Sequence, residues 1–260
     1  METVTTWKET RQQSRATATA GLLSFTRCAA RSSALRRQGG GEPREEAILI
    51  TEGEKQRFIR RSRKYRDLGF DRHAAAEWVA RFAPTAAHPV LDVGTGKGLL
   101  AIALARRFAD VVSVDVSRVD AMLADHLAEE AGVRRRINYL TLDASRLPFR
   151  EGHFGAVAMM DVLHELEDAE PVLEESRRVA RPAGAIILAD FTAEGLELIA
   201  RVHREDDCVH FVGPATIEWA VDWLLKRGFR SEEVRDAHLH RIVVLSKRHS
   251  THAAKRPARA

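Results

Sequence analysis

The stretch that decides the fold runs from residue 91 to residue 100 and reads Leu91-Asp92-Val93-Gly94-Thr95-Gly96-Lys97-Gly98-Leu99-Leu100. Its three glycines lie between an apolar segment, 89–93, which we expect to be a strand, and a segment, 97–108, whose apolar face is typical of a helix. Glycine tolerates positive φ and lets the backbone come close to a ligand. The stretch therefore predicts a strand–turn–helix unit that binds a ligand at its turn.

The spacing of the glycines separates this turn from two common nucleotide motifs. A dinucleotide fingerprint has the pattern G-x-G-x-x-G, whereas Gly94, Gly96 and Gly98 form G-x-G-x-G, with Asp92 two residues before the first glycine. The phosphate-binding pattern G-x-x-x-x-G-K-[ST] is absent. The spacing disfavours a nicotinamide-dependent oxidoreductase, and a generic tight turn stays open as the structural alternative.

Strands alternate with helices along most of the chain. After helices at 52–68 and 71–82, we expect strands at 89–93, 111–115, 136–142, 154–160, 185–189, 229–234 and 239–246. We expect further helices at 97–108, 117–131, 167–180, 194–203 and 215–227. This alternation predicts an α/β fold with a doubly wound, mostly parallel seven-stranded sheet and an antiparallel strand near the C-terminus.

An acidic residue follows each of three predicted strands. Asp115 ends the second strand, Asp143 follows the third, and Asp161 follows the fourth. In open α/β sheets, ligands bind beyond the carboxyl ends of the strands. A carboxylate in the place of Asp115 can accept hydrogen bonds from both hydroxyls of a ribose. That feature suits NAD and other nucleosides equally.

Together, the motif Asp92-x-Gly94-x-Gly96-x-Gly98 and the three acids resemble the class I S-adenosylmethionine-dependent methyltransferases, over about residues 70–246. The resemblance implies a Rossmann-like fold and S-adenosyl-L-methionine as the cofactor. It also implies that Asp143 and the backbone of Ala144 contact the adenine, and that the residues from Asp161 onward line the methionine end. The cofactor-binding residues expected on this basis are Asp92, Gly94, Thr95, Gly96, Gly98, Asp115, Asp143, Ala144, Asp161 and Tyr65. One departure from the family pattern is Ala183, where a second glycine is common.

The sequence indicates the methyl acceptor less clearly than the cofactor. The fourth strand is not followed by an Asn/Asp-Pro-Pro-aromatic motif, which argues against methylation of DNA bases and favours a small-molecule acceptor. His164 is the candidate catalytic base, with His203 and His210 as further candidates, although His164 could instead only shape its loop. The spacing of the 203–210 segment matches no standard zinc pattern, and we expect no metal.

The helix expected at 52–68 is rich in arginine and lysine around Tyr65. Two interpretations stay open for this run: a solvated helix face, or a lid that attracts an anionic acceptor. In the second interpretation Tyr65 faces the cofactor.

Charge and composition set the remaining expectations. The net charge of +4 divides into +5 for residues 1–40, +5 for 247–260 and −6 for the segment between them. We expect basic, disordered extensions at 1–46 and 247–260, and a methyltransferase domain with a helical cover at 47–246. No apolar run approaches the length of a membrane span, and Cys28 and Cys208 form no paired motif, so we expect a soluble cytoplasmic protein. Organelle targeting by the N-terminal extension also stays open.

Two functional alternatives stay open beside a small-molecule methyltransferase. The basic ends are compatible with an RNA or protein methyltransferase, although the acidic body argues against a nucleic-acid partner. An intact cofactor site would also suit a non-catalytic S-adenosylmethionine-binding protein, and fold alone decides none of these alternatives.

Overall fold

The computed structural model describes residues 52–206 and 210–247. The expected extension at 1–46, the segment 248–260 and both cysteines lie outside the described residues. The helices are α1 (Glu52–Asp67), α2 (Arg72–Ala80), α3 (Leu99–Ala105), α4 (Arg118–Glu130), α5 (Glu170–Val179), α6 (Ala193–Glu205) and α7 (Ile217–Leu225), with short 3-10 turns at Arg134–Arg136 and Leu163–Glu165. The strands are β1 (Val90–Val93), β2 (Val111–Asp115), β3 (Ile137–Thr141), β4 (Phe154–Met160), β5 (Ala180–Phe191), β6 (Phe229–Ala237) and β7 (His240–Lys247).

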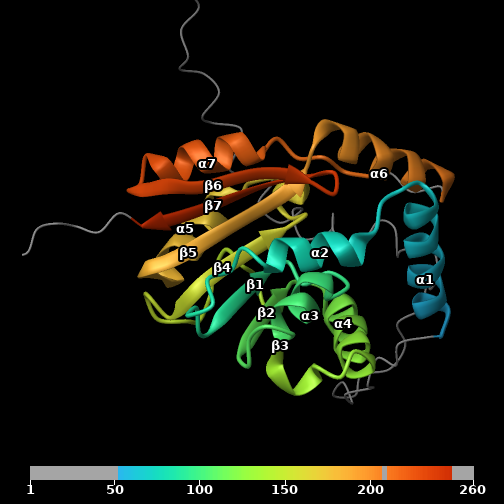
Figure 1. The fold of residues 1–260 in the computed structure, drawn as a ribbon, viewed down its shortest axis with the longest axis horizontal. Helices are drawn as coiled ribbons and strands as arrows, with labels where there is room; N and C mark the ends of the chain where they lie inside the picture. Colours follow the sequence, from blue (N-terminus) through green and yellow to red (C-terminus); the bar gives the residue numbers. More distant parts are fainter. Residues whose placement is uncertain (1–51, 207–209, 248–260) are drawn as a thin grey trace, which may run out of the picture.

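The seven strands form one sheet in the order β3-β2-β1-β4-β5-β7-β6 (Figure 1). The first five strands along the chain pair in parallel, whereas β7 runs antiparallel to both β5 and β6. The predicted mostly parallel sheet with an antiparallel strand near the C-terminus is confirmed. Because β1 lies beside both β2 and β4, the chain reverses its winding direction at β1, which is where ligands bind in such sheets.

Helices cover both faces of the sheet, as a doubly wound fold requires. On one face, α2, α3, α4 and α6 pack onto a core that includes Phe70, Leu104 and Phe108. On the other face, α5 and α7 pack onto a second core that includes Leu173 and Phe229. The central strand β4 is buried along its whole length, which explains its uninterrupted apolar sequence. Among the described residues, no helix is long and apolar enough to cross a membrane.

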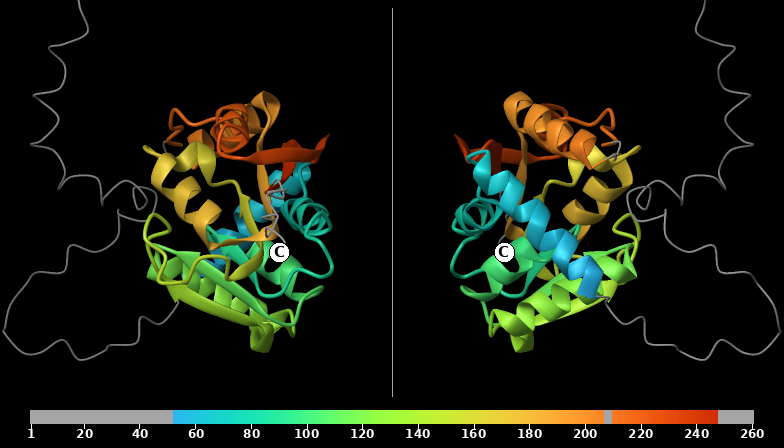
Figure 2. Two further views of the ribbon diagram at one scale, coloured as in Figure 1. Left: turned by 90° about the vertical axis from the view of Figure 1, so that its left-hand side faces the viewer. Right: turned by 90° about the vertical axis from the view of Figure 1, so that its right-hand side faces the viewer.

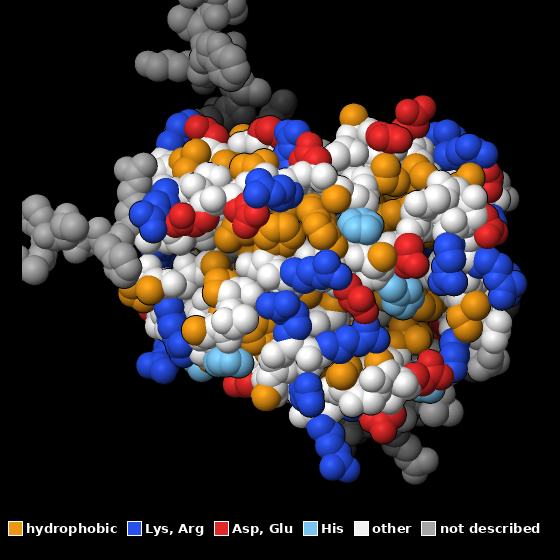
Figure 3. Space-filling model, viewed as in Figure 1, with side chains coloured by type: hydrophobic (Ala, Val, Ile, Leu, Met, Phe, Trp, Pro, Cys, Tyr) orange, Lys and Arg blue, Asp and Glu red, His pale blue; other side chains and the backbone are white. Residues whose placement is uncertain are grey.

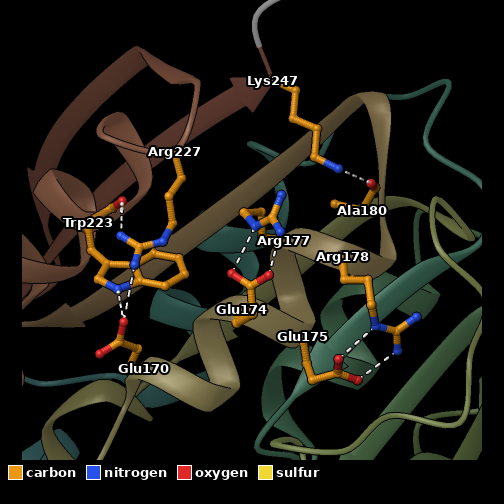
Figure 4. Close-up of polar contacts among 9 residues, drawn as sticks. All are labelled: Glu170, Glu174, Glu175, Arg177, Arg178, Ala180, Trp223, Arg227 and Lys247. Atoms are coloured by element: carbon orange, nitrogen blue, oxygen red, sulfur yellow. Dashed lines mark hydrogen bonds and ion pairs between the residues drawn. The ribbon is translucent and has the colours of Figure 1, made fainter.

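Polar contacts hold α5 and α7 together behind the sheet (Figure 4). The indole Nε1 of Trp223 donates to Glu170 across 3.0 Å, and the guanidinium of Arg227 lies 3.5 Å from the centre of the Trp223 ring. Arg178 donates to the backbone carbonyl of Phe149 at 2.7 Å. These contacts fix the covering helices on the side of the sheet away from α2.

The structure corrects the expected bounds around β5. A helix was expected up to residue 180 and a strand at 185–189, but β5 already begins at Ala180, directly after α5. Ala180 pairs with Phe154, and the register then shifts so that Ala185 pairs with Ala156. The four residues between form an irregularity within the strand. Lys247, expected in a disordered tail, ends β7 and donates to the carbonyl of Ala180 at 2.7 Å.

Helix α1 stands apart from the sheet and runs between α6 and α4 (Figures 1 and 2). Near its start, Lys55 donates to Glu130 of α4 at 2.5 Å. Near its end, Arg61 and Lys64 donate to Asp206, at the C-terminus of α6, at 2.9 and 2.6 Å. The predicted first helix is confirmed, and ion pairs at both ends hold it across one side of the molecule.

Candidate functional site

A cavity of about 490 Å³ opens at the carboxyl ends of the central strands. The glycine-rich turn forms its floor, and α1 and the end of α6 contribute to its outer wall. Eight of the residues expected from the sequence to bind a cofactor line this cavity: Gly94, Thr95, Gly96, Asp115, Asp143, Ala144, Asp161 and Tyr65. Residues from five separate segments of the chain therefore meet around one space.

The glycine-rich turn has no side chain at Gly96 that would fill the adjacent part of the cavity. Gly96 has φ +48, and a Cβ added to it would meet no atom within 4 Å. At Gly94, by contrast, a Cβ would lie 2.3 Å from Cγ2 of Val162. Gly94 is thus required by packing between neighbouring segments, whereas the position of Gly96 leaves room for a ligand against the backbone.

Asp115 holds this turn in place. One of its carboxylate oxygens accepts the N–H of Gly96 at 2.8 Å, and the other accepts the N–H of Ser117 at 2.8 Å. Burial raises the pKa of Asp115, and the two backbone N–H groups act in the opposite direction. Ser117 is the N-cap of α4. The carboxylate is thereby fixed at the end of β2 with lone pairs left for a ligand.

Asp92 lies beneath the turn instead of in the cavity wall. It is 1% exposed, and it accepts a hydrogen bond from the hydroxyl of Ser113 at 2.7 Å. Ser113 in turn bonds the hydroxyl of Thr95 at 2.6 Å. Burial raises the pKa of Asp92 to about 7. Gly98 is likewise absent from the cavity wall, because it caps α3 and packs against Ala124.

Asp161 lies in the cavity wall just beyond β4, in a left-handed backbone conformation with φ +60. One of its oxygens lies 2.7 Å from Nε2 of His240, a fully buried residue at the start of β7. In the sequence, His240 lies 149 residues after Leu91, the first residue of the glycine-rich stretch. No local sequence pattern indicates that His240 contacts the site.

His164 is buried behind the cavity wall and does not line it. Its Nδ1 lies 2.5 Å from Asp190, and its Nε2 is buried and has no hydrogen-bond partner among the described residues. Burial lowers the pKa of His164, but the hydrogen bond and charge of Asp190 outweigh it and raise the pKa overall. The ring of His210 lies 5.2 Å from that of His164 and 4.8 Å from that of His203, which does line the cavity.

The part of the cavity under α1 is aromatic and basic. Phe58 and Tyr65 line it, and the guanidinium of Arg72 lies 5.3 Å from the centre of the Tyr65 ring. Burial raises the pKa of Tyr65. Arg57 and Arg61 also line the cavity here. Tyr65 therefore lies in the cavity wall, and the arginines put positive charge at this end.

Glu165 lines the cavity, and no pattern in the sequence singles it out. It lies one residue beyond His164, and burial raises its pKa to about 7. A carboxyl group of this kind can take up or release a proton near neutral pH. Its pKa depends on burial in the folded chain, which a single sequence does not reveal. Within residues 52–206 and 210–247, no three potential metal ligands gather into a group that could hold a metal ion.

Comparison with known proteins agrees with this geometry. The family model described as "Methyltransferase domain" matches residues 91–188. Demethylmenaquinone methyltransferase of Clavibacter sepedonicus is 30% identical over 207 residues, which cover 68% of this chain and 80% of the relative. Methyltransferase GfsG of Streptomyces halstedii is 33% identical over 130 residues, which cover 49% of this chain and 47% of GfsG. The chain thus spans about half the length of GfsG, and the same holds for the ubiquinone biosynthesis O-methyltransferase of Ralstonia nicotianae.

The fold is also shared with solved structures. Geranyl diphosphate C-methyltransferase of Streptomyces coelicolor superimposes with a TM-score of 0.54 at 12% identity, covering 67% of this chain and 79% of that chain. The chain belongs to the class I S-adenosylmethionine-dependent methyltransferases. The residues fit the cofactor of this family, because the open position at Gly96 and the carboxylates of Asp115 and Asp143 suit a nucleoside.

Proposed function

We propose that this protein transfers a methyl group from S-adenosylmethionine to a small-molecule acceptor. The observation that carries the proposal is the single cavity that joins the strand-end acids Asp115, Asp143 and Asp161 to the pocket under α1. Its volume of about 490 Å³ lies within the usual range of small-ligand sites. Relatives named as methyltransferases of ubiquinone and menaquinone biosynthesis support a small acceptor.

In this proposal, the cofactor supplies an electrophilic methyl group, and the chain aligns the acceptor with it. Asp115 binds the ribose, while Asp143 and the backbone of Ala144 bind the adenine. Gly96 allows close approach, and Tyr65 closes the methionine end from α1. Asp92 and Gly98 support the turn from below, where they shape the site without contacting the ligand. Catalysis is then mainly positioning and exclusion of water.

A base is needed only if the acceptor must lose a proton. His164 keeps the role expected from the sequence as part of the proposal; its ring packs near that of His210, which packs near that of the cavity residue His203. Glu165 is the alternative, because it lines the cavity and has a pKa of about 7. Comparing His164→Gln with Glu165→Gln in a methyl-transfer assay would show which of the two groups moves the proton.

The acceptor end suggests the chemistry of the acceptor. Phe58 and Tyr65 offer apolar surface, and Arg57 and Arg72 offer positive charge beside it. We therefore expect an acceptor with a ring or hydrocarbon part and a negatively charged group. A cytoplasmic location belongs to the same proposal, since the two cysteines form no paired motif.

The test is methyl transfer from labelled S-adenosylmethionine to a panel of phenolic acids, their uncharged esters, RNA and a protein extract. The proposal predicts label on one or more small acids in preference to their esters. Figure 3 shows both Lys or Arg and Asp or Glu side chains on the face in view, and a basic surface of large extent would be typical of RNA binding. Label on RNA or protein alone would instead favour an RNA or protein methyltransferase. Binding of the cofactor without transfer to any acceptor would favour a non-catalytic protein.

A further inference from the structure

Three described residues other than glycine have positive φ, and the side chain of His240 connects two of them. Asp161 has φ +60 beyond β4, and His238 and Leu239 have φ +52 and +62 in the turn between β6 and β7. The Nδ1 of His240 lies 2.6 Å from the carbonyl oxygen of His238, and its Nε2 lies 2.7 Å from Asp161. Unfavourable backbone of this kind persists where surrounding contacts hold it, and it gathers at functional sites.

These contacts define the charge of the His240 ring. A carbonyl oxygen and an ionised carboxylate can only accept hydrogen bonds, so both ring nitrogens must donate. A histidine with two N–H donors is the imidazolium cation. Burial alone lowers the pKa of His240, but the charge and hydrogen bond of Asp161, with the His238 carbonyl, raise it overall. The pair is therefore an imidazolium and a carboxylate.

The surroundings of His240 protect this pair from water. Its side chain is fully buried, and its ring lies 4.4 Å from that of Phe191 and 5.7 Å from that of Phe70. The carboxylates that act on it are Asp161, just beyond β4, and, more weakly, Asp190 from β5. Asp161 is the partner that reaches the cavity, with its side chain 24% exposed. Its Oδ1 is taken by His240, which leaves Oδ2 for a ligand.

We propose that His240 is a positioning residue, which holds the carboxylate of Asp161 directed at the ammonium group of the methionine part of the cofactor. The inference rests on the proposed function and extends it, because it brings the last strand of the sheet into cofactor recognition. The β6–β7 turn then fixes the cofactor indirectly: the carbonyl of His238 orients His240, and His240 orients Asp161.

The first test compares two ligands by calorimetry. S-adenosylhomocysteine and 5′-methylthioadenosine share the adenine, the ribose and the thioether, but only the first carries an ammonium and a carboxylate group. With His240→Gln, we expect the affinity for S-adenosylhomocysteine to fall about tenfold, the usual size for loss of a charged hydrogen bond. The affinity for 5′-methylthioadenosine should not change. Asp161→Asn should produce the same selective loss, and the double variant should add little to either change.

The second test is the pH profile of the ratio between the two affinities. As the pH rises through the pKa of His240, the neutral ring turns a lone pair toward Asp161, and the preference for S-adenosylhomocysteine should fall. In His240→Gln the affinity ratio should not fall in this pH range. Titration of the ligand's own amine should remain in the unaltered protein and in the variant. His153→Gln is the matched control, because His153 packs against Phe149 and Phe154 at the opposite end of β4. It should behave as the unchanged protein.

An equal loss of affinity for both ligands in His240→Gln would give His240 a structural role only and overturn the inference. An unchanged ratio in Asp161→Asn, or an unchanged pH profile in His240→Gln, would overturn it as well. If the unaltered protein binds neither ligand, both the proposed function and the inference about His240 fail. If it binds both and the variants leave their ratio unchanged, only the role of His240 fails.

Discussion

The carboxylate of Asp115 accepts the N–H of Gly96 across 2.8 Å and so ties the glycine-rich turn to the end of the neighbouring strand. Its second oxygen accepts the N–H of Ser117 at the start of α4. One side chain thus fixes both segments that border the cavity at this point. A ligand that bonds Asp115 meets a carboxylate already held in place, which lowers the cost of ordering on binding.

Replacing Asp115 with alanine should weaken binding of S-adenosylhomocysteine by roughly 10- to 100-fold, because two ribose hydroxyls lose a charged acceptor. Calorimetry measures the affinity, and circular dichroism checks that the fold is kept. Asp110→Ala is the control, since Asp110 is exposed in the loop before β2. If Asp115→Ala binds as tightly as the control, the assignment of the ribose to Asp115 is wrong.

Replacing Gly96 with valine should abolish measurable binding, because the new side chain extends into the cavity beside the turn. Gly69→Val is the matched control. Both glycines have positive φ, and a Cβ at either would meet no atom within 4 Å, but Gly69 does not line the cavity. Both variants should lose similar stability from backbone strain, and only Gly96→Val should lose the ligand. Equal affinity in the two variants would contradict the role of Gly96.

Replacing Asp92 with asparagine should stabilise the unliganded protein at alkaline pH. The pKa of Asp92 is raised from 3.8 to about 7, so the folded state holds a proton that the unfolded state releases between these values. The free energy of unfolding therefore falls as pH rises from about 4 to 7 and levels off above 7. Asparagine carries no charge, so Asp92→Asn removes the cost of ionising a buried carboxyl group. We expect the free energy of unfolding to rise by about 1–2 kcal/mol at pH 8, and this rise should shrink toward pH 4. Urea unfolding at both pH values checks this, and a gain independent of pH would contradict it.

Replacing Asp206 with asparagine should loosen α1, because Arg61 and Lys64 both donate to Asp206. These ion pairs are partly exposed, so we expect a loss of no more than about 1 kcal/mol for each. Hydrogen exchange should become faster in α1 and stay unchanged in α3. Glu232→Gln, which removes an exposed ion pair on β6, is the control. Unchanged exchange in α1 would show that other contacts hold the helix.

Much of the fold was predictable because its signals are local. The apolar segments and the glycine spacing predicted the strands, the helices and the ligand-binding turn. Their order along the chain gave the sheet. The bounds of β5 were wrong because its start depends on pairing of Ala180 with Phe154, which lies on another strand.

The site was predictable where chemistry follows a strand end and not where it depends on distant contacts. Asp115, Asp143 and Asp161 were found in this way and line the cavity. The partners His240 and Asp190 could not be found, because the sheet brings them to Asp161 and His164 from later strands. The raised pKa of Glu165 arises from burial, which also has no local sequence signal.

The central claim is tested most directly by calorimetric titration of the purified protein with S-adenosylmethionine, S-adenosylhomocysteine and NAD in parallel. We predict that the first two bind, that NAD does not, and that Asp115→Ala weakens both. Binding of NAD alone would contradict the assignment of the cavity to S-adenosylmethionine.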